Sequence, residues 1–287
     1  MNFRTDLTLE RTELIKGELT GVKKETTKNK YTVTTIIDIL NEEAAEKLGK
    51  GIGRYITIDI PELGNLSDEH EGIVTDVSDA LGKLLPDSEG LVLVAGVGNA
   101  DITADALGPF VATRIFSTRH LSEELQKSIG FTEVLRPVAA ISTGVLGQTG
   151  LESSEYIKCI SGEIKPVCVI TVDALASRSV ERLGTTIQMS DTGIAPGSGI
   201  GNKRKRIDEE FLGVPVIAVG VPTVVDALAL VRSLCKDENL SLKEEPNLIV
   251  TPKDIDMLIE NSVNVISEAI NLTLQKSLGY ADLKSLL

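Results

Sequence analysis

The sequence of 287 residues has no tryptophan, three cysteines and two histidines. Three cysteines without a CxxC spacing exclude a disulfide framework and a zinc knuckle. We expect Cys159, Cys168 and Cys235 to be buried, reduced thiols of a cytosolic protein. A two-histidine metal site would need His70 and His120 to converge, and the HExxH and GxSxG signatures of common hydrolases are absent.

Positive charge is also scarce. The chain has 29 lysines and arginines and 42 aspartates and glutamates, which gives a net charge of −13. This charge opposes non-specific attraction to nucleic acid and to anionic membranes, and a basic protein or peptide would suit it better. The longest uncharged apolar stretch, residues 213–225, is too short to span a bilayer. The N-terminus lacks the apolar core of a signal peptide, so we expect a cytoplasmic protein without membrane or direct nucleic-acid partners.

Short runs that are apolar at every position indicate strands covered on both faces, and hence a mainly parallel central sheet. An N-terminal β-rich extension precedes them, with β-branched residues at strand spacing in 31–39 and 54–60. Because 42% of the residues are apolar, the chain can bury one large core or two modest ones, and from the pattern of elements we expect a single α/β domain over residues 1–287. The apolar runs are 90–95, 137–142, 166–172, 215–220 and 247–251.

Helical patterns separate these runs, which predicts a three-layer α/β sandwich with helices on both faces of the sheet. Thr251 is expected to cap the last helix. The glycine-rich stretch 190–206 is expected to form a long loop, and long loops in compact domains are often functional. The expected helices are 67–85, 103–119, 151–162, 223–236 and 252–276.

The loop GVGNADITADALGP, residues 96–109, raises the question of a phosphate site. A dinucleotide fingerprint needs a third glycine where Asp101 stands, and an acid there would compete with a phosphate for the helix N-terminal amides. The other glycine cluster, GSGIGNK, lacks the adjacent Gly-Lys of a nucleotide-binding P-loop. We therefore expect no nucleotide cofactor, and the loop could instead hold Asp101 or Asp105 over a substrate.

The triplet Asp-Thr-Gly at 191–193 matches the active-site triplet of pepsin-like enzymes. Those enzymes need two such aspartates to share a proton, whereas this chain has one copy and a strand–helix alternation that is wrong for an all-β fold. Asp191 is kept as a reserve site candidate.

Two acids hold positions where ligands bind in open α/β sheets, at the carboxyl ends of the strands. Asp105 lies in the turn or first helical turn after the run 90–95, and Asp173 directly follows the strand 167–172. Two facing acids would split their pKa values, so that one stays protonated while the other activates water, as aspartyl peptide hydrolysis requires. The structural alternative is that Asp105 is an acid at a helix N-terminus, where the helix dipole stabilises negative charge, and that Asp173 caps a helix.

Several stretches, in order over nearly the whole chain, resemble the germination protease family of spore-forming bacteria, which are atypical aspartic endopeptidases. The resemblance implies catalytic aspartates at Asp105 and Asp173 and a fold related to the hydrogenase maturation endopeptidases. Those relatives use a histidine for metal, and no histidine stands in a matching place, so neither a metal nor a cofactor is expected. The matching stretches are RTDLTLE (4–10), GNADITADALGP (98–109), RHL (119–121), residues 169–202, GVPTVVDA (220–227) and VTPKDID (250–256).

The resemblance also implies substrates, assembly and processing. The family degrades small acid-soluble spore proteins in the spore core during germination, and the resemblance to it implies a homotetramer. They are made as zymogens that remove a leader by self-cleavage between an acid and a hydrophobic residue, which Asp6 and Leu7 match, while Thr8 departs from the usual alanine. Residues 1–6 would then be a short propeptide.

The basic stretch 202–206 could meet the acid before the scissile bond of a substrate, or could be a solvated loop. Two other functions stay open at this point. One is a peptidase like the hydrogenase maturation enzymes, and the other is a non-catalytic protein that binds spore proteins.

Overall fold

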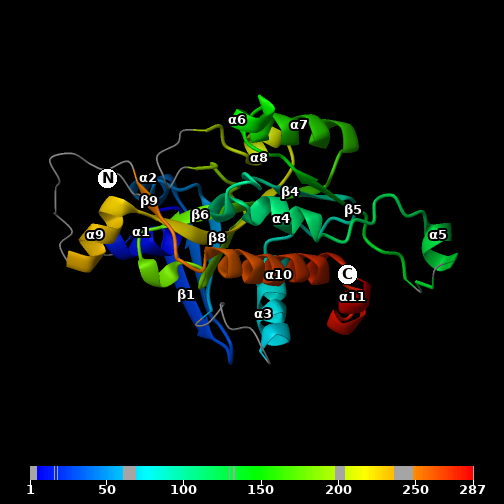
Figure 1. Ribbon diagram of the computed structural model, residues 1–287, viewed down its shortest axis with the longest axis horizontal. Coiled ribbons are helices and arrows are strands. Elements are labelled where there is room, and N and C mark those ends of the chain that lie inside the picture. Colours follow the sequence, from blue (N-terminus) through cyan, green and yellow to red (C-terminus); the bar gives the residue numbers. More distant parts are fainter. Residues whose placement is uncertain are drawn as a thin grey trace.

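A mixed β-sheet forms the centre of the computed structural model (Figure 1). The structure describes residues 5–15, 17, 19–60, 69–128, 130–131, 133–197, 204–235 and 248–286. Within these residues the strand order is β1-β2-β3-β7-β8-β6-β4-β5, and β9 pairs with β8. The strands are β1 (Val22–Lys28), β2 (Val33–Ile39), β3 (Gly53–Asp59), β4 (Val92–Gly96), β5 (Val138–Ser142), β6 (Cys168–Ser177), β7 (Thr186–Ser190), β8 (Val216–Asp226) and β9 (Ile249–Val250).

Four of the five predicted apolar runs form the parallel part of the sheet, β5-β4-β6-β8. The N-terminal β-rich extension continues the same sheet, because β1, β2, β3 and β7 pair antiparallel and β7 joins β8. The fifth run was wrongly predicted as a buried parallel strand. Only Ile249 and Val250 are extended there, and they pair antiparallel with the end of β8 and stay exposed.

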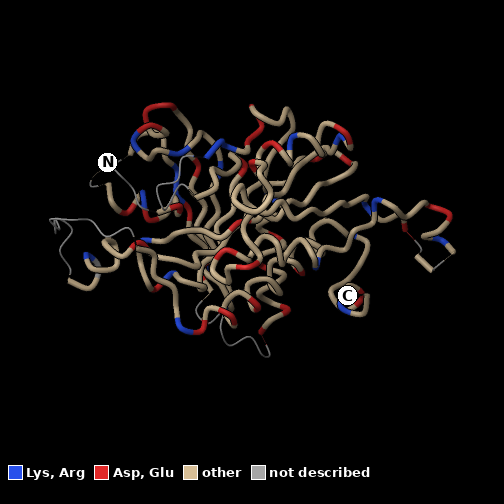
Figure 2. Tube along the Cα trace, turned by 45° about the horizontal axis from the view of Figure 1, so that its top comes forward, with Lys and Arg blue, Asp and Glu red and all other residues tan. Residues whose placement is uncertain are grey.

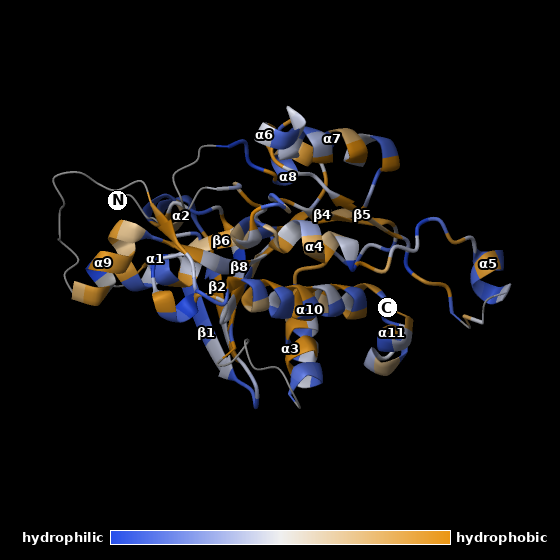
Figure 3. Ribbon diagram, viewed as in Figure 1, coloured by the Kyte–Doolittle hydropathy of each residue, from blue (hydrophilic) through white to orange (hydrophobic). Residues whose placement is uncertain are grey.

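Helices cover both faces of the sheet, which confirms the three-layer α/β class. The largest core cluster joins α3 (His70–Gly82), α4 (Leu107–Thr113) and α10 (Ile255–Leu274) to one face. Ile157 of α7 (Ser153–Ile164) packs on the other face, so that α7 and α10 lie on opposite sides of the sheet in Figure 1. Hydrophobic residues concentrate in the central strands in Figure 3. Shorter helices are α1 (Thr8–Leu14), α2 (Glu42–Leu48), α5 (Glu123–Ser128), α6 (Leu146–Thr149), α8 (Glu209–Leu212), α9 (Ala227–Cys235) and α11 (Tyr280–Leu286), with 3-10 turns η1 (Thr103–Asp105) and η2 (Val180–Arg182).

Three of the predicted helices differ most from those observed, and residues 67 and 68 of the helix expected over 67–85 lie outside the described residues. β8 continues through Asp226 because its second half pairs with β6, so the helix expected from residue 223 begins only at Ala227. The helix expected over 103–119 is split into η1 and the short α4. Thr251 does not cap α10, since its hydroxyl donates to the Thr223 carbonyl at 2.9 Å and the helix begins at Ile255.

The prediction of three buried cysteines is correct for one. Cys168 lies inside β6 and is buried, whereas Cys159 and Cys235 are exposed. Cys159 is on the side of α7 away from the buried residues Ile157 and Ser161. None of the described helices has both the length and the apolar character that a bilayer span requires. Acidic residues are spread along the whole trace in Figure 2.

Candidate functional site

Asp173 lies within strand β6 and is 4% exposed. β4 ends at Gly96, which pairs with Val172 of β6. Asp173 is therefore the first residue of β6 that lies beyond the end of β4. Its Oδ1 atom accepts a hydrogen bond from the Ala174 N–H at 2.9 Å. The strand continues to Ser177, so the prediction that Asp173 directly follows a strand is wrong, and so is the alternative that it caps a helix.

Asp105 is the last residue of the 3-10 turn η1, just before α4. Its Oδ2 atom accepts from the Asn99 N–H at 2.9 Å, which ties the carboxylate to the loop that leaves β4. Asp105 directly precedes Ala106, the N-cap residue of α4, so the alternative that it is an acid at a helix N-terminus stays open.

Glycines let this loop press against β6. Gly98 has φ +124°, and a Cβ atom on it would overlap the Asp105 carbonyl. A Cβ atom on Gly108 would overlap the carbonyls of Val97 and Val172. Because of this close approach, Asp105 and Asp173 line one cavity of about 260 Å³.

Burial disfavours the charged form of both carboxyl groups. It raises the pKa of Asp173 well above the ordinary value, and the charges of Asp105 and Asp6 add to the rise. Burial also raises the pKa of Asp105, against the lowering effects of the Asn99 N–H and of Arg204. Arg204 lines the same cavity. The pair can therefore hold one proton and one negative charge together.

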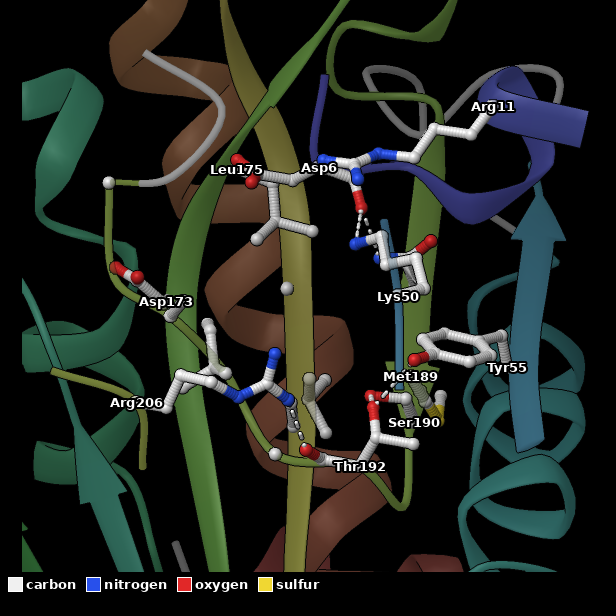
Figure 4. Close-up of a pocket in the computed structure, with 18 of the residues that line it drawn as sticks. Asp6, Arg11, Lys50, Tyr55, Asp173, Leu175, Met189, Ser190, Thr192 and Arg206 are labelled. Carbon is white, nitrogen blue, oxygen red and sulfur yellow. Dashed lines mark hydrogen bonds between the residues drawn. The ribbon is translucent and has the colours of Figure 1, made fainter. Parts of the chain in front are cut away.

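A second cavity, of about 180 Å³, adjoins the first and shares Asp6 and Asp173 with it. Figure 4 shows Lys50 on the side of this cavity opposite Asp173. Loss of hydration, followed by repulsion from Arg11, lowers the pKa of Lys50 to about 7. Sequence reasoning missed Lys50 and Arg11, because neither stands in a motif and only the fold brings them to Asp173.

The two halves of the predicted cleavage site are buried beside these cavities. Asp6 is 8% exposed and Leu7 is fully buried. The Asp6 N–H donates to the Ala176 carbonyl of β6 at 2.8 Å, and its carboxylate accepts from the Ala176 N–H at 2.9 Å. Cleavage between Asp6 and Leu7 stays a prediction, and in this conformation Asp6 is held against β6.

The reserve candidate Asp191 is not brought to the pair. It is exposed, lines neither cavity, and accepts from the Arg54 N–H at 2.8 Å, which fixes the start of β3. In the basic stretch, residues 202 and 203 lie outside the described residues. Arg206 donates to the Thr192 carbonyl at 3.0 Å and lines the second cavity.

In the part of the chain that the structure describes, no group of three or more His, Cys, Asp or Glu side chains is arranged so that it could hold a metal ion. Neither histidine lines the two cavities, and His70 instead bonds Glu268 at 2.7 Å. Catalysis without a metal stays a prediction.

Comparisons with known proteins agree with the resemblance in the sequence. The germination protease family matches residues 5–237. Germination proteases of Caldanaerobacter subterraneus subsp. tengcongensis and Clostridium tetani are 42% and 40% identical, over the whole chain and 98% and 100% of the relatives. A germination protease of Bacillus velezensis is 34% identical, over 96% of the chain and 94% of the relative.

Among solved structures, the chain is similar to a NiFe hydrogenase maturation protease of Thermococcus kodakarensis. That similarity covers 67% of this chain and 98% of the other, with 18% identity and a TM-score of 0.38. The family assignment rests on the sequence matches, which span nearly the full length. The chain belongs to the germination protease family and is a peptidase.

Proposed function

We propose that the chain is an aspartic-type endopeptidase in which Asp105 and Asp173 activate water for peptide hydrolysis. The observation that carries this proposal is that both carboxyl groups line one cavity whose burial raises both pKa values. Two carboxyl groups that share a proton supply the base and the acid that peptide hydrolysis needs.

In the proposed reaction, Asp173 keeps the proton, since it is the more deeply buried of the two. The Asp105 carboxylate removes a proton from water as the water oxygen attacks the scissile carbonyl carbon. The Asp173 hydroxyl protonates the carbonyl oxygen. When the tetrahedral intermediate collapses, the C–N bond breaks and the proton held by Asp105 goes to the leaving nitrogen, while the proton on the intermediate hydroxyl returns to Asp173.

Small acid-soluble spore proteins are the substrates that we propose, on the basis of the family resemblance. Arg204 at the cavity of the two aspartates supplies a positive charge for an acidic side chain of such a substrate. The spore core as location and the homotetramer as assembly belong to the same proposal.

Substitution of each aspartate tests the mechanism. Asp105→Asn and Asp173→Asn should each lower cleavage of a purified spore protein at least about 1000-fold with the fold intact, as measured by mass spectrometry of the fragments. Asp101→Asn is the matched control, because Asp101 is exposed in the same loop and its carboxylate accepts from Gln148 at 2.8 Å. Near-normal cleavage by either variant of the pair would refute the mechanism.

The same assay separates the alternatives. Complex formation without fragments would identify a non-catalytic binder of spore proteins. Cleavage of a hydrogenase large-subunit tail that depends on nickel would identify a maturation-like peptidase.

Self-processing is the second part of the proposal, with residues 1–6 as the leader. Incubation under acidic, dehydrated conditions should yield a chain that starts at Leu7, measured by intact mass. The Asp6 carbonyl must first leave Lys50 and Gln188, which both donate to it. An unchanged N-terminal mass, under conditions that activate a relative, would contradict this prediction.

A further inference from the structure

The segment Thr5–Thr8 is held as a protein holds a bound peptide. Its main chain pairs with Ala176 at the edge of β6, through the Asp6 N–H at 2.8 Å. This edge is open to the segment because β4 pairs with β6 only as far as Val172. Pairing of an extended peptide with an open strand edge is a common mode of peptide recognition.

Two side chains donate hydrogen bonds to the Asp6 carbonyl oxygen. Lys50 Nζ donates to this oxygen at 2.6 Å, and Gln188 Nε2 donates at 3.0 Å. The Oε1 atom of Gln188 also accepts from the Thr8 N–H, at 2.6 Å. All three contacts are to main-chain atoms, so they would hold the backbone of another peptide without regard to its side chains.

The position of these contacts connects them to the site. Asp6, Lys50, Gln188 and Asp173 line one cavity. In Figure 4, Lys50 points to the Asp6 carbonyl, and Asp173 lies on the opposite side of the same pocket. A peptide that passed over Asp173 could therefore continue along the edge of β6 to Lys50 and Gln188.

We propose that the groove formed by Ala176, Lys50 and Gln188 is a subsite for the backbone of an extended substrate peptide, which competes with the chain's own Thr5–Thr8 segment. The proposal rests on the proposed peptidase function and assigns to Lys50 and Gln188 the binding of a substrate carbonyl. The positive charge of Lys50 strengthens such a hydrogen bond.

Binding of a labelled peptide tests the proposal without cleavage. The probe is a fluorescein-labelled peptide with the sequence of residues 3–10, FRTDLTLE, added to the full chain with Asp173→Asn at pH 6 and followed by fluorescence anisotropy. Asp6→Ala removes the carboxylate bond to Ala176 and loosens the competing segment. It should strengthen probe binding about fivefold, because a tethered competitor acts at a high effective concentration.

Lys50→Met in that Asp6→Ala background should then weaken probe binding about tenfold, the loss expected for a charge-assisted hydrogen bond. Gln188→Glu, which keeps the acceptor for an N–H but removes the donor, should weaken it as well. Lys47→Met is the control, since Lys47 is exposed and pairs only with Glu43 among the contacts described. Circular dichroism confirms the fold of each variant.

A groove that takes no part in binding a second peptide gives a different result. In that case Lys50→Met and Gln188→Glu in the Asp6→Ala background would leave probe binding unchanged, which would overturn the proposal. Unchanged binding in Asp6→Ala would overturn it too. Because the probe is bound and not cleaved, these outcomes are independent of whether the two aspartates prove catalytic.

Discussion

At the residue scale, Asp173 shows the cost of keeping a carboxyl group inside the sheet. Its surroundings disfavour the charged form, so the folded protein binds a proton that the unfolded chain releases near the ordinary pKa of 3.8. The stabilising effect of that proton is fully present below this value and is lost as the pH rises through the raised pKa. The buried Asp173 carboxyl is in this respect a weak point of the fold at neutral pH.

We therefore expect Asp173→Asn to raise the melting temperature at pH 7 while it removes activity. The amide cannot ionise, and its oxygen can still accept from the Ala174 N–H. The gain should shrink as the pH falls and vanish below the ordinary pKa of 3.8, where wild-type Asp173 is protonated in both states. Calorimetry at several pH values measures the difference, with Asp101→Asn as a control that changes little, and a loss of stability at pH 7 would contradict the expectation.

At the element scale, the loop between β4 and α4 depends on glycines that admit close backbone contact. Gly108 is the second residue of α4, where a side chain would meet the carbonyls of Val172 in β6 and of Val97 in the loop after β4. A Cβ atom added to Gly147 in α6 would meet nothing within 4 Å, so this glycine provides a matched comparison.

Gly108→Ala should destabilise the fold by about 1–3 kcal/mol through overpacking. It should also lower activity about 100-fold, because Asp105 moves away from Asp173. Gly147→Ala should leave both quantities nearly unchanged. Urea unfolding and the spore-protein assay measure the effects, and equal behaviour of the two variants would show that close packing does not position Asp105.

The same elements show what sequence could predict. Apolar runs identified β4, β5, β6 and β8, because strands covered on both faces leave a continuous apolar signal. The extension of β6 to Ser177 was missed, since residues 174–177 have no strand pattern of their own and are extended through pairing with β8. Lys50 and Gln188 could not be found, because they meet Asp6 only across 44 and 182 positions of the chain.

At the scale of the whole molecule, one sheet connects the N-terminal extension to the peptidase core. β3 pairs with β7, and β7 pairs with β8, so the antiparallel and parallel parts share a continuous set of hydrogen bonds. The largest core cluster also takes residues from both parts, including Ile56 of β3 and Ile170 of β6. One domain over residues 1–287 stays a prediction.

A single cooperative unfolding transition should follow from this arrangement. Far-ultraviolet circular dichroism and tyrosine fluorescence should give the same midpoint in urea, and the chain has no tryptophan to complicate the fluorescence signal. Tyr31 and Tyr55 lie in the N-terminal part and Tyr156 and Tyr280 in the remainder, so fluorescence samples both parts, and circular dichroism reports on the whole. Two separate midpoints would contradict the single domain.

The strand order also has a consequence for synthesis on the ribosome. β8 lies between β7 and β6 in the sheet, although it is the last of the three in the chain. Asp105, Asp173 and Gln188 all precede β8 in the chain. The ribosome therefore makes these residues before it makes β8, the strand that pairs with both β6 and β7. Pairing of residues 216–226 with β6 and β7 is therefore a late assembly step, and the growing polypeptide cannot complete the proposed site until they have emerged.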